Sequence, residues 1–163
     1  MRRMLALFAI VLLICCVFVG CKTEEEQHVV ATHIMFNNTE VKLGAVYDST
    51  LAEALGKVAG TEEISSCHYD GVDTIYRYGD HLQIYTYLSE GKNVMYTLKI
   101  GNDRIKTAEG AYVGMTYEQI VELYGEEYTE LPNGISYPLP VEKQHLIFRM
   151  KDDVVTYIEY YAE

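Results

Sequence analysis

The chain has 163 residues and a formal net charge of −11, with 24 acidic and 13 basic residues. This balance argues against nucleic-acid binding, where Lys and Arg must neutralise phosphates. It also argues against attachment to anionic lipid through a basic patch. The length beyond an N-terminal leader suits one compact domain with its own core.

The first twenty residues have the layout of a secretory signal peptide. Arg2-Arg3 forms a basic start, an apolar run extends from Leu5 to Val19, and Gly20 supplies a small residue at the cut. We therefore predict that residues 1–20 are removed, which would move the net charge from −11 to −13 because two arginines are lost. The apolar run is near the lower limit of roughly 17 residues for a membrane-spanning helix, so an uncleaved anchor is the alternative.

The four residues at the predicted cut are Phe18-Val19-Gly20-Cys21. They resemble the bacterial lipobox, although Phe18 stands where Leu is usual. The resemblance implies that the Cys21 thiol receives a lipid and holds the protein at the extracytoplasmic face of the cell membrane. Residues 21–32 would then be the lipidated cysteine and an acidic, solvated tether.

Cysteine usage agrees with this interpretation. Cys15 and Cys16 lie in the leader and Cys21 would carry lipid, so Cys67 is the only cysteine of the predicted domain. An internal disulfide is therefore impossible. We interpret Cys67 as a structural, buried thiol, since its neighbours do not make a metal-binding spacing.

Tyrosine is the unusual component, with 15 residues against four phenylalanines and no tryptophan. Tyrosine favours strands and can pack its ring against apolar groups while its hydroxyl remains in contact with solvent. One interpretation is that these rings form the core and cover of a sheet. The other is a binding face, because tyrosine is also enriched in protein interfaces.

Two helices are predicted from capping signals and apolar spacing. Thr116-Tyr117-Glu118-Gln119 fits a capping box, and Thr50-Leu51-Ala52-Glu53 offers the same pattern. Tyr117, Ile120, Val121 and Tyr124 then follow the spacing of a buried helix face. Gly125 and Gly56 are suited to end the two helices.

Strand signals follow each predicted helix. Residues 81–87 and 94–100 form a hairpin by composition, with a turn at Glu90-Gly91-Lys92-Asn93. Residues 145–150 and 154–160 repeat this arrangement around Lys151-Asp152-Asp153. Residues 135–139 predict a further strand, which we expect at a sheet edge because Pro138 has no backbone donor.

Each predicted helix is thus followed by a predicted hairpin, and this order occurs twice. We predict a weak internal repeat, with copies at about 33–100 and 104–161, within one domain at residues 33–163. We predict an α+β fold of two helix-plus-antiparallel-hairpin repeats, with the helices packed on one face of an antiparallel sheet. Gly44 and Gly114 should lie at matching positions just before the helices.

A family resemblance accompanies this repeat. Val113-Gly114-Met115-Thr116 leads into a helix that ends at Tyr124-Gly125, echoed by Leu43-Gly44 and Leu55-Gly56. In this the chain resembles the tandem units of the β-lactamase-inhibitor-protein family and of small outer-membrane-assembly lipoproteins. The resemblance implies a fold more than a function, because one fold hosts many activities.

No catalytic or metal-binding motif stands out. The histidines lack a metal spacing, and His81 and His145 match through the repeat alone. Asp70 and Asp73, on either side of Gly71, fit a turn better than a calcium loop. We therefore expect no enzyme activity, no metal and no cofactor.

The sequence is compatible with three classes of function. The first is a lipid-anchored protein-interaction domain of unknown envelope or secreted partner, with Tyr85 and Tyr87 as its possible face; inhibition of a secreted enzyme is one version. The second is a binder of a small ligand, sugar or peptide, in a tyrosine-lined groove. The third is an enzyme. A contiguous tyrosine patch favours the first, a concave pocket the second, and a buried acid pair in a cleft the third.

Overall fold

The computed structural model describes residues 29–66 and 71–163, so the predictions for residues 1–28, Cys21 included, and for Cys67 lie outside the described residues. The described part contains ten strands and two helices. The helices are α2 (Ser49–Leu55) and α3 (Tyr117–Tyr124). The strands are β1 (His33–Phe36), β2 (Thr39–Lys42), β3 (Gly60–Ser65), β4 (Val72–Tyr78), β5 (Leu82–Ser89), β6 (Lys92–Ile100), β7 (Thr129–Leu131), β8 (Gly134–Pro138), β9 (Gln144–Lys151) and β10 (Val154–Ala162).

Eight of these strands form one antiparallel sheet, ordered β3-β4-β5-β6-β10-β9-β8-β7. The strands after each helix run as a meander, and the two meanders join where β6 pairs with β10. β1 and β2 form a separate two-stranded sheet. Their connection at Asn37 and Asn38 has positive φ at both residues, the conformation that a tight hairpin turn requires.

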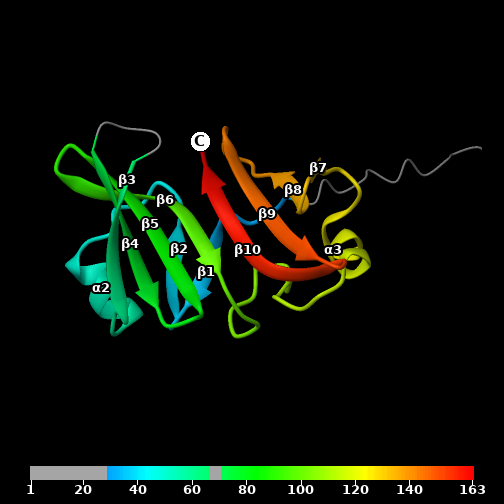
Figure 1. The fold of residues 1–163 in the computed structure, drawn as a ribbon, viewed down its shortest axis with the longest axis horizontal. Helices are drawn as coiled ribbons and strands as arrows, with labels where there is room; N and C mark the ends of the chain where they lie inside the picture. Colours follow the sequence, from blue (N-terminus) through cyan, green and yellow to red (C-terminus); the bar gives the residue numbers. More distant parts are fainter. Residues whose placement is uncertain (1–28, 67–70) are drawn as a thin grey trace, which may run out of the picture.

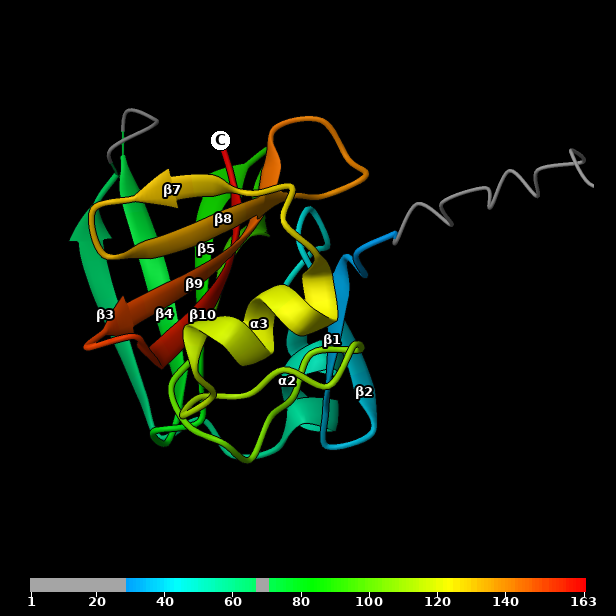
Figure 2. The same cartoon turned by 90° about the vertical axis from the view of Figure 1, so that its right-hand side faces the viewer.

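The helices and the small sheet lie on one side of the large sheet. Figure 1 looks onto the large sheet, and β1 and β2 lie behind it. In the turned view of Figure 2 the strands β3 and β4 are at the left, and β1, β2 and α2 are at the right. Among the described residues, no helix lies against the other face, which we call the uncovered face.

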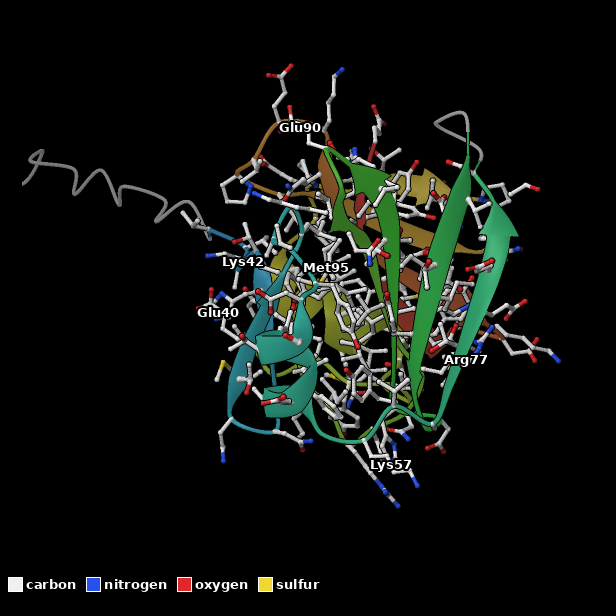
Figure 3. All side chains as sticks on the ribbon, turned by 90° about the vertical axis from the view of Figure 1, so that its left-hand side faces the viewer. Glu40, Lys42, Lys57, Arg77, Glu90 and Met95 are labelled. Atoms are coloured by element: carbon white, nitrogen blue, oxygen red, sulfur yellow. The ribbon has the colours of Figure 1, made fainter. Side chains whose placement is uncertain are left out.

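One apolar core fills the space between the large sheet and its covering elements. In β5, Leu82 and Ile84 are fully buried and alternate with half-buried residues, as a strand with one core face requires. Ile120 of α3 and Ile34 of β1 join the same core cluster from the other side. Figure 3 shows side chains filling this layer, with Met95 of β6 labelled within it.

The predicted fold class was wrong. The two helices have only seven and eight residues, and strands dominate the described part. Each helix is followed by four antiparallel strands, so the units are not helix-plus-hairpin repeats. The sequence pattern missed β3, β4 and β7. Of these, β3 and β7 are edge strands with mostly exposed residues, which give little apolar alternation.

Cap chemistry explains where the helices begin. Thr116 caps α3, and Gln119 returns a side-chain hydrogen bond, so the predicted capping box is confirmed. The start predicted at Thr50 is wrong, since α2 begins at Ser49 and its cap is Asp48. The Asp48 carboxylate accepts from the Leu51 backbone N–H at 2.9 Å, which satisfies one free donor of the first turn.

The matching positions of Gly44 and Gly114 are confirmed by backbone hydrogen bonds. Gly44 donates to Met95 in β6 at 2.8 Å, and Gly114 donates to Val155 in β10 at 2.9 Å. Both glycines have positive φ, 77° and 105°, which glycine adopts without strain. Each therefore turns the chain from the sheet toward its helix in the same way.

The strand predicted around Pro138 is present, but it is not at the edge. β7 covers β8 on its outer side and pairs with residues Gly134 to Ser136. That ladder ends two residues before Pro138, so the missing donor costs no pairing with β7.

Candidate interaction face

Five half-buried tyrosines lie on the uncovered face, and we call this group the tyrosine face. Tyr85 and Tyr87, the residues proposed from the sequence, alternate in β5 with core residues and therefore point away from the helices. The full set, from β5, β6 and β10, is Tyr85, Tyr87, Tyr96, Tyr157 and Tyr161. The other tyrosines include core residues, so the interpretation of tyrosine as part of the sheet core holds for part of the set.

A β-bulge brings Tyr96 onto this face. In the pairing of β5 with β6, Tyr85 faces Thr97 and Thr86 faces Met95, so Tyr96 is an extra residue. Two residues of β6, Tyr96 and Thr97, therefore lie opposite the single residue Tyr85. In such a bulge both residues direct their side chains to the same face as the residue opposite them. Sequence reasoning missed Tyr96 because simple alternation assigns it to the core face with Leu98.

The three tyrosines of β5 and β6 pack against one another. The Tyr96 ring lies 6.2 Å from the ring of Tyr85 and 6.1 Å from that of Tyr87, within the range of favourable aromatic pairs. The Tyr85 hydroxyl donates to the side chain of Gln83 at 3.1 Å. Burial raises the pKa of Tyr85, so its phenol stays neutral at physiological pH.

The face continues across the junction of the two meanders. Tyr161 in β10 pairs with Thr97 in β6, on the same side as Tyr85. The Lys99 ammonium lies 3.7 Å from the centre of the Tyr157 ring, a cation–π contact. The tyrosine face therefore spans β5, β6 and β10.

Charged residues on the same face are paired. Arg77 in β4 forms an ion pair with Glu62 in β3. Arg149 in β9 lies 3.5 Å from Glu159 in β10, measured from Nε to a carboxylate oxygen. The chain is strongly acidic as a whole, whereas this face combines tyrosine with arginine, a composition enriched at protein interfaces.

Asp73 was predicted to lie in a turn, and this is wrong. It is the second residue of β4 and is only 3% exposed. One carboxylate oxygen accepts from the Tyr96 hydroxyl at 2.9 Å. The other is buried and accepts no hydrogen bond from the part of the chain that the structure describes. Sequence reasoning missed this because Asp73 lies beneath Tyr96, which reaches it only through the bulge in the pairing of β5 with β6.

Within residues 29–66 and 71–163, no group of three or more His, Cys, Asp or Glu side chains could hold a metal ion. His81 contacts its neighbour Asp80 at 2.9 Å, and His145 lies 3.6 Å from Glu163. No described helix is long and apolar enough to cross a membrane.

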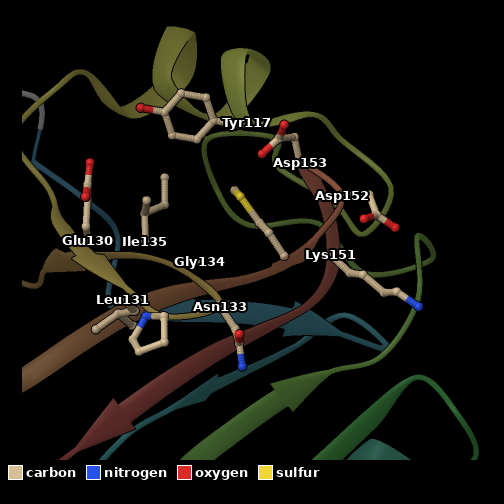
Figure 4. A pocket seen from close by; sticks show the side chains of 11 residues that line it. Tyr117, Glu130, Leu131, Asn133, Gly134, Ile135, Lys151, Asp152 and Asp153 are labelled. Carbon is tan, nitrogen blue, oxygen red and sulfur yellow. The ribbon is translucent and has the colours of Figure 1, made fainter.

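Two hollows open at the ends of hairpins. The larger, of about 500 Å³, lies where the β7–β8 and β9–β10 turns meet the start of α3. Figure 4 shows Tyr117 above it, with Glu130 and Asp153 at its rim and Ile135 between them. The second, of about 390 Å³, lies at the matching end of β3–β4 and β5–β6 and includes Asp73 and Tyr87.

Comparison with known proteins adds a fold relationship. No protein-family model matches the chain, and no curated protein does. Among solved structures, the chain is similar to an extracellular protein containing an SCP domain from Bacillus anthracis, with a TM-score of 0.52 and 14% identity. The match covers 74% of this chain and 44% of that one, so the chain spans less than half of that protein's length. At this identity the likeness shows the fold alone.

Proposed function

We propose that this protein is a lipid-anchored, extracytoplasmic interaction domain that binds an envelope or secreted protein through its tyrosine face. The observation that carries the proposal is the contiguous set of half-buried tyrosines on a sheet face that no described helix covers. Large, rigid aromatic side chains contribute most of the binding energy at interfaces, since they bury much area at little cost in conformational entropy.

The entry of the chain into the domain supports this arrangement. The backbone N–H of Ala31 donates to Glu109 at 2.7 Å, and Ile34 bridges to Thr107, both on the covered side. The N-terminal segment therefore joins the domain on the side opposite the tyrosine face. A tether from Cys21 to Val29 would reach roughly 25 to 30 Å when extended. An anchor there keeps the point of attachment off the tyrosine face.

The anchor is tested by metabolic labelling with a fatty acid. We expect label on the wild-type protein and none on Cys21→Ser, because the thiol is the acceptor. The variant should also keep residues 1–20, since cleavage follows lipid transfer in lipobox proteins. Equal labelling of both proteins would contradict the anchor and leave the binding face to be tested separately.

The face is tested by photo-crosslinking in the native host. A photoreactive phenylalanine analogue replaces Tyr85 in one variant and Tyr87 in another. The matched control carries the analogue at Tyr112, a half-buried tyrosine packed against the core from the covered side. We expect one protein to crosslink at both sheet positions and not at the control position.

The opposite pattern, with crosslinks at Tyr112 and none at Tyr85 or Tyr87, would overturn the proposal.

Binding of a sugar or peptide in a groove stays the second prediction. The hollow of about 500 Å³ at the β7–β8 and β9–β10 turns is open to solvent, whereas sites for small ligands usually enclose most of the ligand.

A further inference from the structure

The β1–β2 hairpin has one open strand edge. Its turn at residues 37–38 makes Phe36 and Thr39 a hydrogen-bonded pair, and such pairs alternate along an antiparallel ladder. Glu40 and Lys42 therefore direct their backbone N–H and C=O groups away from β1. No residue in the described part of the chain pairs with this side of β2. The edge thus offers two donors and two acceptors to another strand.

A groove of about 400 Å³ lies beside this edge, between β2 and α2. Glu40 and Lys42 line it on the strand side. Its apolar lining comes from the loop after β2, from α2 and from β6, and consists of Ala45, Val46, Leu51, Ala54 and Met95. Figure 3 shows Glu40 and Lys42 at the outside of the molecule, with Met95 deeper within it. The unpaired edge therefore borders a space that is open to solvent.

Both ends of the edge are held in place by hydrogen bonds. At the turn, the Asn37 side-chain amide donates to the carbonyl of Leu55, the last residue of α2, at 2.7 Å. After the strand, the backbone N–H of Gly44 donates to the carbonyl of Met95 in β6 at 2.8 Å. The edge is thus fixed relative to α2 and β6 before a second strand binds, which lowers the entropic cost of association.

The charges along the edge are self-complementary. Glu40 and Lys42 are both exposed and lie on the same side of β2, where their side chains form an ion pair at 3.1 Å. A second copy can pair with the edge in antiparallel orientation about a two-fold axis at Val41. Glu40 of each copy then lies opposite Lys42 of the other. This register gives each pair two backbone hydrogen bonds and opposite charges across the strands.

The edge of the large sheet at β3 behaves in the opposite way. Ser66 donates to Gly71 at 3.1 Å, so by alternation Thr61, Glu63 and Ser65 direct their backbone groups outward. The register that would pair all three with a second copy is centred on Glu63 and places two glutamates opposite each other. Like charges in that position destabilise strand pairing. Charge therefore favours β2 over β3 for pairing between copies.

We infer that two copies of this chain associate through β2 and form a four-stranded sheet, ordered β1-β2-β2-β1, about a two-fold axis at Val41. The groove beside α2 in each copy receives β2 of the other. Since the hairpin lies on the covered side, both tyrosine faces remain available to a partner. This association goes beyond the proposed function and does not depend on the tyrosine face.

Sedimentation equilibrium of the full-length chain in density-matched detergent measures the association. About 0.15 M salt is included, because a Debye length of about 8 Å then screens the repulsion between two acidic chains. We expect a monomer–dimer equilibrium for the wild type. Glu40→Lys and Lys42→Glu each turn two attractive pairs into two repulsive ones, so the dissociation constant should rise by about tenfold or more. Wild-type chains that stay monomeric up to about 0.1 mM, or variants that dimerise as tightly as the wild type, would overturn the inference.

Mixing the two variants tests the register itself. Glu40→Lys has two lysines at the edge and Lys42→Glu has two glutamates, so neither complements itself but each complements the other. We expect the equimolar mixture to form a heterodimer with about the wild-type affinity, and failure to do so would refute this register. Glu63→Lys makes the same charge reversal at the β3 edge and should leave dimerisation unchanged. A loss there as large as that of Glu40→Lys would also contradict pairing through β2.

Discussion

The two faces of the eight-stranded sheet bury their side chains by different means. On the covered face, helices and the small sheet press against Leu82, Ile84 and Phe148, which are fully buried and apolar. On the uncovered face, Asp73 and Ile75 are almost as buried, although no described helix lies over them. Their cover comes from the sheet's own large side chains. The first face therefore stabilises the fold by apolar burial, whereas the second combines a buried acid with half-buried tyrosines.

Truncation of a large side chain on the covered face should lower the free energy of unfolding the most. Phe148→Ala should lower the free energy of unfolding by about 3 to 5 kcal/mol, because the ring packs against Tyr124 and Tyr137 in the core. Arg149→Ala, the next residue but on the uncovered face, should cost less than about 1 kcal/mol. Urea unfolding measures both. Similar losses in the two variants would mean that the faces do not differ in their contribution to stability.

Alkaline pH should also act mainly through the covered face. Burial raises the pKa of Tyr124, Tyr137 and Tyr160, so the folded state keeps protons that the unfolded chain loses near pH 10. Stability should be full below that pH and fall above it, by up to about 1.4 kcal/mol per pH unit for each such tyrosine. Thermal melts across this range, with tyrosinate absorbance, test the sign. A rise in stability above pH 10 would contradict it.

The uncovered face should respond to loss of one hydroxyl. Tyr96→Phe removes the donor to Asp73 and should cost about 1 to 3 kcal/mol, since a buried carboxylate oxygen then loses its hydrogen bond. Tyr85→Phe removes a hydrogen bond at a partly exposed position and should cost less. Urea unfolding of both variants decides the order. An unchanged free energy of unfolding in Tyr96→Phe would mean that the hydrogen bond to Asp73 does not stabilise the fold.

The smallest change in the free energy of unfolding is expected for Glu122→Ala, on the exposed side of α3, for which Ile120→Ala is the buried comparison. Ile120 is fully buried and Glu122 is exposed. Ile120→Ala should cost about 2 to 5 kcal/mol and Glu122→Ala less than about 0.5 kcal/mol. The reverse order in denaturant melts would place the helix in a different rotation against the sheet.

Local chemistry was sufficient to predict several features from the sequence. The capping box at Thr116, the hairpins that became β5–β6 and β9–β10, and the matching positions of Gly44 and Gly114 all follow from contacts within a few residues or from a repeated pattern. Tyr85 and Tyr87 were recognised together because alternation in a strand assigns them to one face.

Only the tertiary structure decided the rest. The joining of two meanders through β6 and β10 depends on pairing between residues about sixty positions apart, which no local pattern records. The bulge that turns Tyr96 outward exists only because β5 and β6 pair with one extra residue. The burial of Asp73 follows from that same pairing, which packs Tyr96 over it. Local sequence determined where α3 and the two hairpins lie, and long-range pairing determined which side chains meet, because register is a property of two strands together.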